Sequence, residues 1–96
     1  MTVGIVGLGI MGSAYAGNLL AAGVQVMGSD PAVLGRERLE SAGGKTYVHV
    51  GPWVADCDLI IIAVASPKVL AAVSWQLAEF LKEGQVVMET GTFAMA

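Results

Sequence analysis

The chain has 96 residues, enough for one domain that forms its own hydrophobic core without a disulfide or a structural metal. Its net charge is −3 and it carries no basic cluster, which argues against a nucleic-acid partner. An apolar share of 55% with only 14% charged residues favours a sheet that is covered on both faces.

Residues 1–29 contain no charged side chain, a pattern that hydropathy alone would score as a signal peptide or a membrane span. A signal peptide needs a positive N-terminal region, and none is present. Glycines interrupt the whole stretch, as expected for strand, turn, helix and strand in succession, so we exclude a membrane segment. Cys57 is the only cysteine and no metal-ligand cluster is visible, so we expect a cytoplasmic protein without a metal site.

The first predicted element is a buried strand over residues 3–6, followed by a glycine-rich turn and an apolar helix. The turn reads GxGxxG and comprises Gly7, Leu8, Gly9, Ile10, Met11 and Gly12. In dinucleotide-binding folds the first glycine permits the tight turn and the second leaves space for a pyrophosphate. The third lets the helix pack closely on the strand, while N–H groups at the helix start face the phosphate. We therefore predict that these six residues bind a dinucleotide; a glycine-rich turn without a ligand is the alternative.

A second strand over residues 24–27 leads to Asp30, about 20 residues beyond the glycines. NAD-binding folds place there an acid that accepts hydrogen bonds from the adenosine ribose. Its carboxylate would repel the 2′-phosphate of NADP, so we expect NAD rather than NADP as the cofactor. Arg36 and Arg38 keep NADP open, since either could reach a phosphate; otherwise they are solvated charges on a helix face.

Asp30 also has a structural interpretation. Followed by Pro31, it fits an N-cap with proline at the first position of a helix over residues 32–42. The capping and ribose roles can be shared, because each carboxylate oxygen has two lone pairs.

The rest of the chain alternates helices and strands, which is typical of a parallel sheet. After the helix over 32–42 we expect an edge strand over 46–50, a helical turn over 53–55, a central strand over 58–64, a helix over 67–82 and a strand over 85–89. Five strands with crossing helices predict an α/β, Rossmann-type doubly wound parallel sheet in a single domain over residues 1–96. The expected spatial order of the strands is 3-2-1-4-5.

Ligands of such sheets bind beyond the carboxyl ends of the strands, at the switch between the first and fourth strands. The loop after the fourth strand should lie along the cofactor, and the tail near its nicotinamide end. The predicted cofactor-binding residues therefore also include Pro31, Val64, Ala65, Ser66 and Thr92. Ser66 fits a helix cap equally well, and Thr92 a solvated tail.

Residues 5–23 resemble the N-terminal signature of the β-hydroxyacid dehydrogenases, which include 3-hydroxyisobutyrate, tartronate semialdehyde and 6-phosphogluconate dehydrogenases. Asp30 and the segments 55–60 and 89–92 continue the resemblance in register. Tyr15 and Pro31 stand where the family usually has other residues, as do residues 65–67 and Gly91. The pattern over residues 26–30 and 62–64 is also similar to prephenate and arogenate dehydrogenases, which are an alternative.

The resemblance implies an NAD(P)-dependent oxidoreductase that transfers a hydride between a nicotinamide cofactor and a small hydroxyacid. It also implies a second, all-helical domain with the catalytic lysine, which we expect outside these 96 residues. We assign no catalytic residue here, because Lys45, Lys68 and Lys82 match no catalytic position and His49 is expected at a surface edge. The 96 residues alone should then be inactive and could form a homo-oligomer. A stand-alone nucleotide-binding module, or an interaction domain without a ligand, is the alternative.

Overall fold

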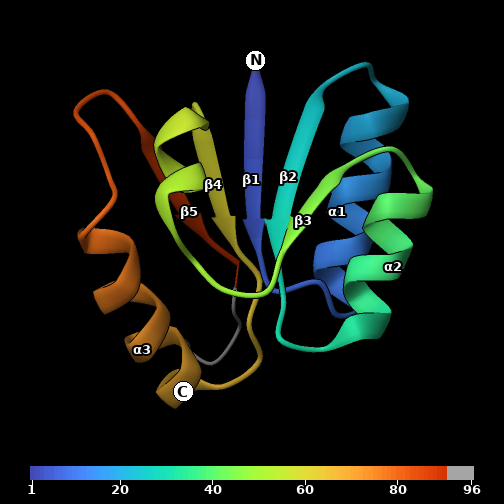
Figure 1. Cartoon of the computed structure of the whole chain (residues 1–96). Coiled ribbons are helices and arrows are strands. Elements are labelled where there is room, and N and C mark those ends of the chain that lie inside the picture. Colours follow the sequence, from blue (N-terminus) through green and yellow to red (C-terminus); the bar gives the residue numbers. More distant parts are fainter. Residues whose placement is uncertain (91–96) are drawn as a thin grey trace.

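The computed structural model describes residues 1–90, which form a five-stranded parallel sheet in the order β3-β2-β1-β4-β5 (Figure 1). Along the chain the elements are β1 (Thr2–Val6), α1 (Ile10–Ala21), β2 (Gln25–Ser29), α2 (Val33–Ser41), β3 (Lys45–Tyr47), η1 (Pro52–Asp56), β4 (Leu59–Ile62), α3 (Pro67–Ala78) and β5 (Val86–Glu89). The predicted fold class and strand order are confirmed.

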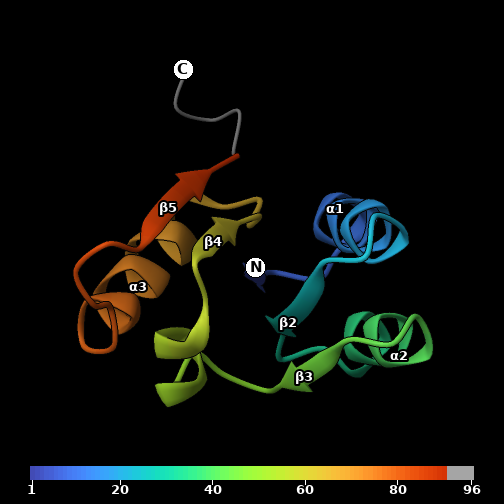
Figure 2. The same cartoon turned by 90° about the horizontal axis from the view of Figure 1, so that it is seen from above.

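Helices lie on both faces of the sheet, with α1 and α2 on one side and α3 and η1 on the other (Figure 2). Because side chains alternate along a strand, the central strands feed both cores. Ile5 and Ile61 pack on the side of α1 and α2, whereas Val6, Ile60 and Ile62 pack with α3 and η1. Burial on both faces explains the apolar composition of these strands.

Cys57 and Trp53 approach the sheet where β1 carries Gly4. A Cβ atom at Gly4 would lie 2.8 Å from the Cys57 sulfur and 3.1 Å from the Trp53 ring. The Trp53 ring also stacks on Tyr47 at the end of β3, with ring centroids 5.0 Å apart. Glycine at position 4 thus lets η1 pack directly against the central strand.

Some element boundaries differ from those expected. The third strand ends at Tyr47 instead of residue 50, and α2 begins at Val33. The last helix ends at Ala78 rather than near residue 82, because the N–H groups of Phe80 and Leu81 both bond to the Leu77 carbonyl and close its final turn. None of the helices within residues 1–90 is long and apolar enough to cross a bilayer.

Candidate functional site

Two glycines of the turn between β1 and α1 are required by close packing. Gly7 has φ +100°, and a Cβ there would collide with the Ala63 carbonyl oxygen at the end of β4. A Cβ at Gly12 would collide with the Gly7 carbonyl oxygen and lie 3.5 Å from the Ala63 Cβ. These steric roles match the turn and packing functions expected for the first and third glycines.

Gly9 differs from both of these glycines. Its φ of −71° is accessible to any residue, and a Cβ built there meets no atom of the described residues within 4 Å. Folding therefore does not require glycine at this position. The Gly9 backbone faces open space in the groove. A ligand that approaches this backbone closely would explain the residue.

The N-terminus of α1 begins beside this open space. Within the described residues no side chain caps it and its first turn holds no acidic residue. Ile10 at its first position is 87% exposed, whereas the Leu8 side chain is fully buried. Unpaired N–H groups and the helix dipole make such an end favourable for an anion.

Asp30 lies at the end of β2 and accepts two backbone hydrogen bonds. Its Oδ2 accepts the N–H of Leu8 at 2.7 Å, and its Oδ1 accepts the N–H of Ala32 at 2.8 Å. The alternative interpretation of Asp30 as the N-cap is wrong, because Ala32 occupies the N-cap of α2 and Pro31 lies before the helix. The carboxylate instead connects the glycine turn to the turn after β2, and each oxygen keeps a lone pair for a further donor.

Arg36 and Arg38 are not simply solvated charges on the face of α2. Arg36 donates to the carbonyl oxygens of Asp30 at 3.0 Å and Pro31 at 3.4 Å, and Arg38 donates to the Leu8 carbonyl at 3.1 Å. The Arg36 guanidinium therefore lies at the turn after β2, and the Arg38 guanidinium lies at the glycine turn. Sequence spacing shows only that they follow Asp30, whereas their partners depend on how α2 packs.

A cavity of about 420 Å³ opens at the carboxyl ends of the strands. It is lined by Val6, Gly7, Gly9, Ser29, Asp30, Pro31, Val48, His49, Val50, Ala63, Val64, Ala65, Val69, Ala72, Val73 and Gln76. We call it the carboxyl-end groove. It brings together six of the residues predicted from sequence: Gly7, Gly9, Asp30, Pro31, Val64 and Ala65.

The other predicted residues lie in different surroundings. Leu8, Ile10, Met11 and Gly12 belong to the turn but do not line the groove, and Ser66 caps α3 by accepting the Val69 N–H at 3.4 Å. Thr92 lies outside the described residues. Sequence reasoning did not assign Val48 and His49 after β3 to the groove, nor Val69, Ala72 and Gln76 of α3. The i, i+3, i+7 spacing of those three α3 residues could have indicated a shared face.

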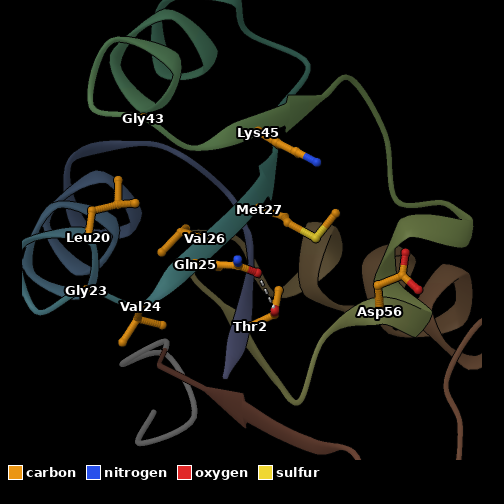
Figure 3. Close-up of a pocket in the computed structure, with 10 residues that line it drawn as sticks. All are labelled: Thr2, Leu20, Gly23, Val24, Gln25, Val26, Met27, Gly43, Lys45 and Asp56. Atoms are coloured by element: carbon orange, nitrogen blue, oxygen red, sulfur yellow. Dashed lines mark hydrogen bonds between the residues drawn. The ribbon is translucent and has the colours of Figure 1, made fainter.

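A second cavity of about 510 Å³ lies at the opposite, amino ends of the strands (Figure 3). It is lined by Thr2, Leu20, Gly23, Val24, Gln25, Val26, Met27, Gly43, Lys45 and Asp56. Its polar groups partly pair with one another, since the Thr2 hydroxyl donates to the Gln25 amide oxygen at 3.2 Å. This cavity is larger, but ligands of parallel sheets bind at the carboxyl ends, where the glycine turn lies.

The remaining candidate groups are metal-ligating side chains and the thiol of Cys57. No group of three His, Cys, Asp or Glu side chains within residues 1–90 could hold a metal ion. Burial, with smaller contributions from the carboxylates of Asp56 and Asp58, raises the pKa of Cys57 to about 11. The thiol is therefore neutral at physiological pH, and it lies in the core rather than in the groove.

Comparison with known proteins agrees with this geometry. Residues 2–96 match the family described as the NAD binding domain of 6-phosphogluconate dehydrogenase. The fold is similar to 3-hydroxyisobutyrate dehydrogenase from Salmonella typhimurium, with 29% identity, a TM-score of 0.89 and 96% of this chain covered. It is also similar to the Mycobacterium tuberculosis 3-hydroxyisobutyrate dehydrogenase in a structure with L-serine, with 25% identity, a TM-score of 0.87 and 95% covered.

A more distant likeness concerns the fold alone. An imine reductase from Myxococcus stipitatus in complex with NADP+ shares 20% identity with a TM-score of 0.86 over 96% of this chain. The chain spans about a third of each of these proteins, namely 33%, 31% and 32% of their lengths in the order given. No curated protein sequence matches the chain.

Proposed function

The chain belongs to the family of the NAD binding domain of 6-phosphogluconate dehydrogenase, and from this premise we propose that its carboxyl-end groove binds NAD. The observation that supports this proposal most strongly is the open space beside Gly9. Gly7 and Gly12 are accounted for by packing within the fold, whereas no steric contact within residues 1–90 requires glycine at position 9. A pyrophosphate lying against the Gly9 backbone supplies the missing reason.

The proposed contacts follow the groove from one end to the other. The turn from Gly7 to Gly12 and the first N–H groups of α1 would bind the pyrophosphate. Asp30 would accept hydrogen bonds from the adenosine ribose through its remaining lone pairs, with Pro31 beside it. The nicotinamide half would follow Val64, Ala65 and Ser66 at the end of β4, with Thr92 as a further proposed contact.

NAD is the proposed cofactor in preference to NADP. The Asp30 carboxylate lines the groove at the end of β2, and it would repel the 2′-phosphate that distinguishes NADP. The two arginines that could favour a phosphate already donate to backbone carbonyls, Arg36 to that of Asp30 and Arg38 to that of Leu8. A 2′-phosphate would have to compete for them.

The whole protein is proposed to be an oxidoreductase acting on a small hydroxyacid. Bound NAD supplies a hydride acceptor at nicotinamide C4, and NADH the corresponding donor. The residues of this chain bind and orient the cofactor, while the group that moves the substrate proton is proposed to lie on a helical domain outside these 96 residues. Assays of the full-length protein with NAD and small hydroxyacids test this part, and the absence of NAD reduction with every such substrate would contradict it.

Gly9→Ala tests the cofactor site itself. Because the new methyl group enters open space at an ordinary φ, the free energy of unfolding should change by no more than about 1 kcal/mol. The same methyl group occupies the place proposed for the pyrophosphate, so the dissociation constant for NAD should rise at least about tenfold, or about 1.4 kcal/mol. Calorimetric titration with NAD and urea denaturation measure the two quantities.

Gly17→Ala is the matched control, because Gly17 is a glycine of α1 whose Cβ also enters open space, away from the groove. It should leave NAD affinity unchanged and stabilise the helix by up to about 1 kcal/mol. Equal NAD affinity in the wild type and in Gly9→Ala would contradict the proposed pyrophosphate position. A wild type that binds no NAD would overturn the function.

A further inference from the structure

The backbone N–H and carbonyl of Leu8, in the glycine turn, are both held by side chains from other segments. Its N–H donates to the Asp30 carboxylate at 2.7 Å. Its carbonyl oxygen accepts the Ser13 hydroxyl at 2.9 Å and the Arg38 guanidinium at 3.1 Å. The three partners come from the turn after β2, from α1 and from α2, and none of them belongs to the turn itself.

Helix α2 also approaches Leu8 through a glycine outside the GxGxxG motif. A Cβ at Gly35 would collide with the Leu8 carbonyl oxygen and would lie 2.8 Å from the Leu8 Cβ. Gly35 and Arg38 are three residues apart, so they lie on the same face of α2. One face of α2 therefore provides both the close approach to Leu8 and a charged donor to its carbonyl.

We propose that α2 positions the pyrophosphate-binding turn through Gly35 and Arg38, which hold the Leu8 carbonyl. This inference rests on the proposed function. Gly9 follows Leu8 directly, so fixing the Leu8 carbonyl and N–H also fixes where the Gly9 backbone faces the groove. Arg38 is a positioning residue, because it acts on the cofactor through the Leu8 carbonyl and does not line the groove.

The physical benefit is preorganisation of a turn that would otherwise have to be ordered when the ligand binds. A turn containing Gly7 and Gly9 has high conformational freedom, and ordering it on binding would weaken affinity. A charge-assisted bond from Arg38 reduces that freedom in the unliganded protein. Loss of the bond should therefore appear in cofactor affinity as well as in stability.

Arg38→Met and Gly35→Ala test the inference in the full chain, with NAD as the probe. Arg38 is exposed, so Arg38→Met should fold, and its dissociation constant for NAD should rise about tenfold. The rise should persist in 1 M salt, where the Debye length is only about 3 Å and a direct attraction between Arg38 and the phosphates is screened. Gly35→Ala changes no charge and should also weaken NAD binding by displacing the turn.

Amide hydrogen exchange at Leu8 gives a local readout that distinguishes displacement of the glycine turn from a general loss of stability. Exchange of the Leu8 N–H should accelerate in Arg38→Met relative to other core amides, because the turn moves away from Asp30. Gly17→Ala serves as the control, with unchanged exchange at Leu8 and unchanged NAD affinity.

The outcomes separate the inference from the function on which it rests. If the wild type binds NAD while Arg38→Met binds it equally well and protects Leu8 equally, the inference is wrong and the function stands. An affinity loss in Arg38→Met that disappears in 1 M salt would also overturn it, because direct electrostatic attraction would then be the cause. If the wild type binds no NAD, the function and the inference are both overturned.

Discussion

The Asp30 carboxylate accepts hydrogen bonds from the protein backbone. Its two oxygens accept the N–H groups of Leu8 and Ala32, so it fixes the glycine turn against the start of the second βα connection. A hydrogen bond to a charged group contributes about 1.5–3 kcal/mol when fully formed. The residue is therefore important for the shape of the site even before a ribose is bound.

Asp30→Ser should lower stability, since the shorter hydroxyl cannot accept both N–H groups as the carboxylate does. We expect a loss of about 1–3 kcal/mol in the free energy of unfolding, measured by urea denaturation, and weaker NAD binding. Asp30→Ser also removes the carboxylate that would repel the 2′-phosphate, and adding Pro31→Arg supplies a cation, so the ratio of NADP to NAD affinity should rise in the double variant. An unchanged ratio in the double variant would contradict the specificity role of Asp30.

Cys57 makes the free energy of unfolding depend on pH in the alkaline range. The side chain is 3% exposed, and burial raises the pKa of its thiol to about 11. Unfolding exposes a thiol that ionises at lower pH, so stability should decline from about pH 9 to pH 11 by at most about 2–3 kcal/mol. Below about pH 7.5 the thiol is almost entirely neutral in both states and contributes no pH dependence.

Cys57→Ala isolates this effect from other groups that titrate in the same range. Urea denaturation at pH 8, 9, 10 and 11 should show the wild type losing stability relative to the variant as pH rises. Parallel curves for the two proteins would show that the thiol ionises equally readily in the folded and unfolded states.

At the scale of elements, the three long helices begin in different ways. Among residues 1–90 no side chain caps α1, which follows Gly9, or α2, which follows Ala32. The α3 N-terminus is capped by Ser66, and Pro67 follows it. The Ser66 cap is a local pattern and could be recognised from sequence. The hydrogen bond between Asp30 and the Leu8 N–H could not be recognised in this way, because the two residues lie 22 positions apart in the chain.

Strand β5 is exposed along its whole length. It pairs only with β4 among the described residues, and Val86, Val87 and Met88 are 60%, 41% and 45% exposed. Exposed apolar strand edges favour pairing with another chain. The isolated 96-residue chain should therefore self-associate at millimolar concentration, as measured by light scattering.

Val86→Lys should reduce this association, because a charged side chain on an edge strand opposes pairing. Leu34→Lys is the matched control, since Leu34 is 63% exposed but lies on α2, away from β5. A wild type that is strictly monomeric at millimolar concentration would contradict the prediction. So would equal effects of the two substitutions.

For the whole molecule, local patterns predicted the architecture well. The apolar runs of β1 and β4 and the alternation of helices and strands led to the five-stranded parallel sheet and its strand order, because both are imposed by hydrophobic periodicity and the handedness of crossovers. The steric roles of Gly7 and Gly12 also followed from the motif. Sequence did not predict the hydrogen-bond partners of Arg36 and Arg38 or the position of His49 in the groove, since these depend on the packing of distant segments.

The two cavities lie at opposite ends of the sheet, and each is a candidate site for the cofactor. The carboxyl-end groove contains the glycine turn and Asp30, whereas the larger cavity at the amino ends contains Thr2, Gln25 and Lys45 (Figure 3). Volume alone would favour the larger cavity. The free N–H groups of a helix start and the open backbone at Gly9 favour the groove.

Titration of the isotope-labelled chain with NAD, followed by amide chemical shifts in NMR spectra, tests the central claim most directly. We predict saturable shifts at Gly7, Gly9 and Gly12, at Asp30 and at Ala65, with little change at the amide groups around the larger cavity. An isolated domain should show a dissociation constant of about 0.1–1 mM, or roughly −5.5 to −4.1 kcal/mol. Shifts concentrated at Thr2, Gln25 and Lys45, or no shifts at several millimolar NAD, would contradict the assignment of the groove as the cofactor site.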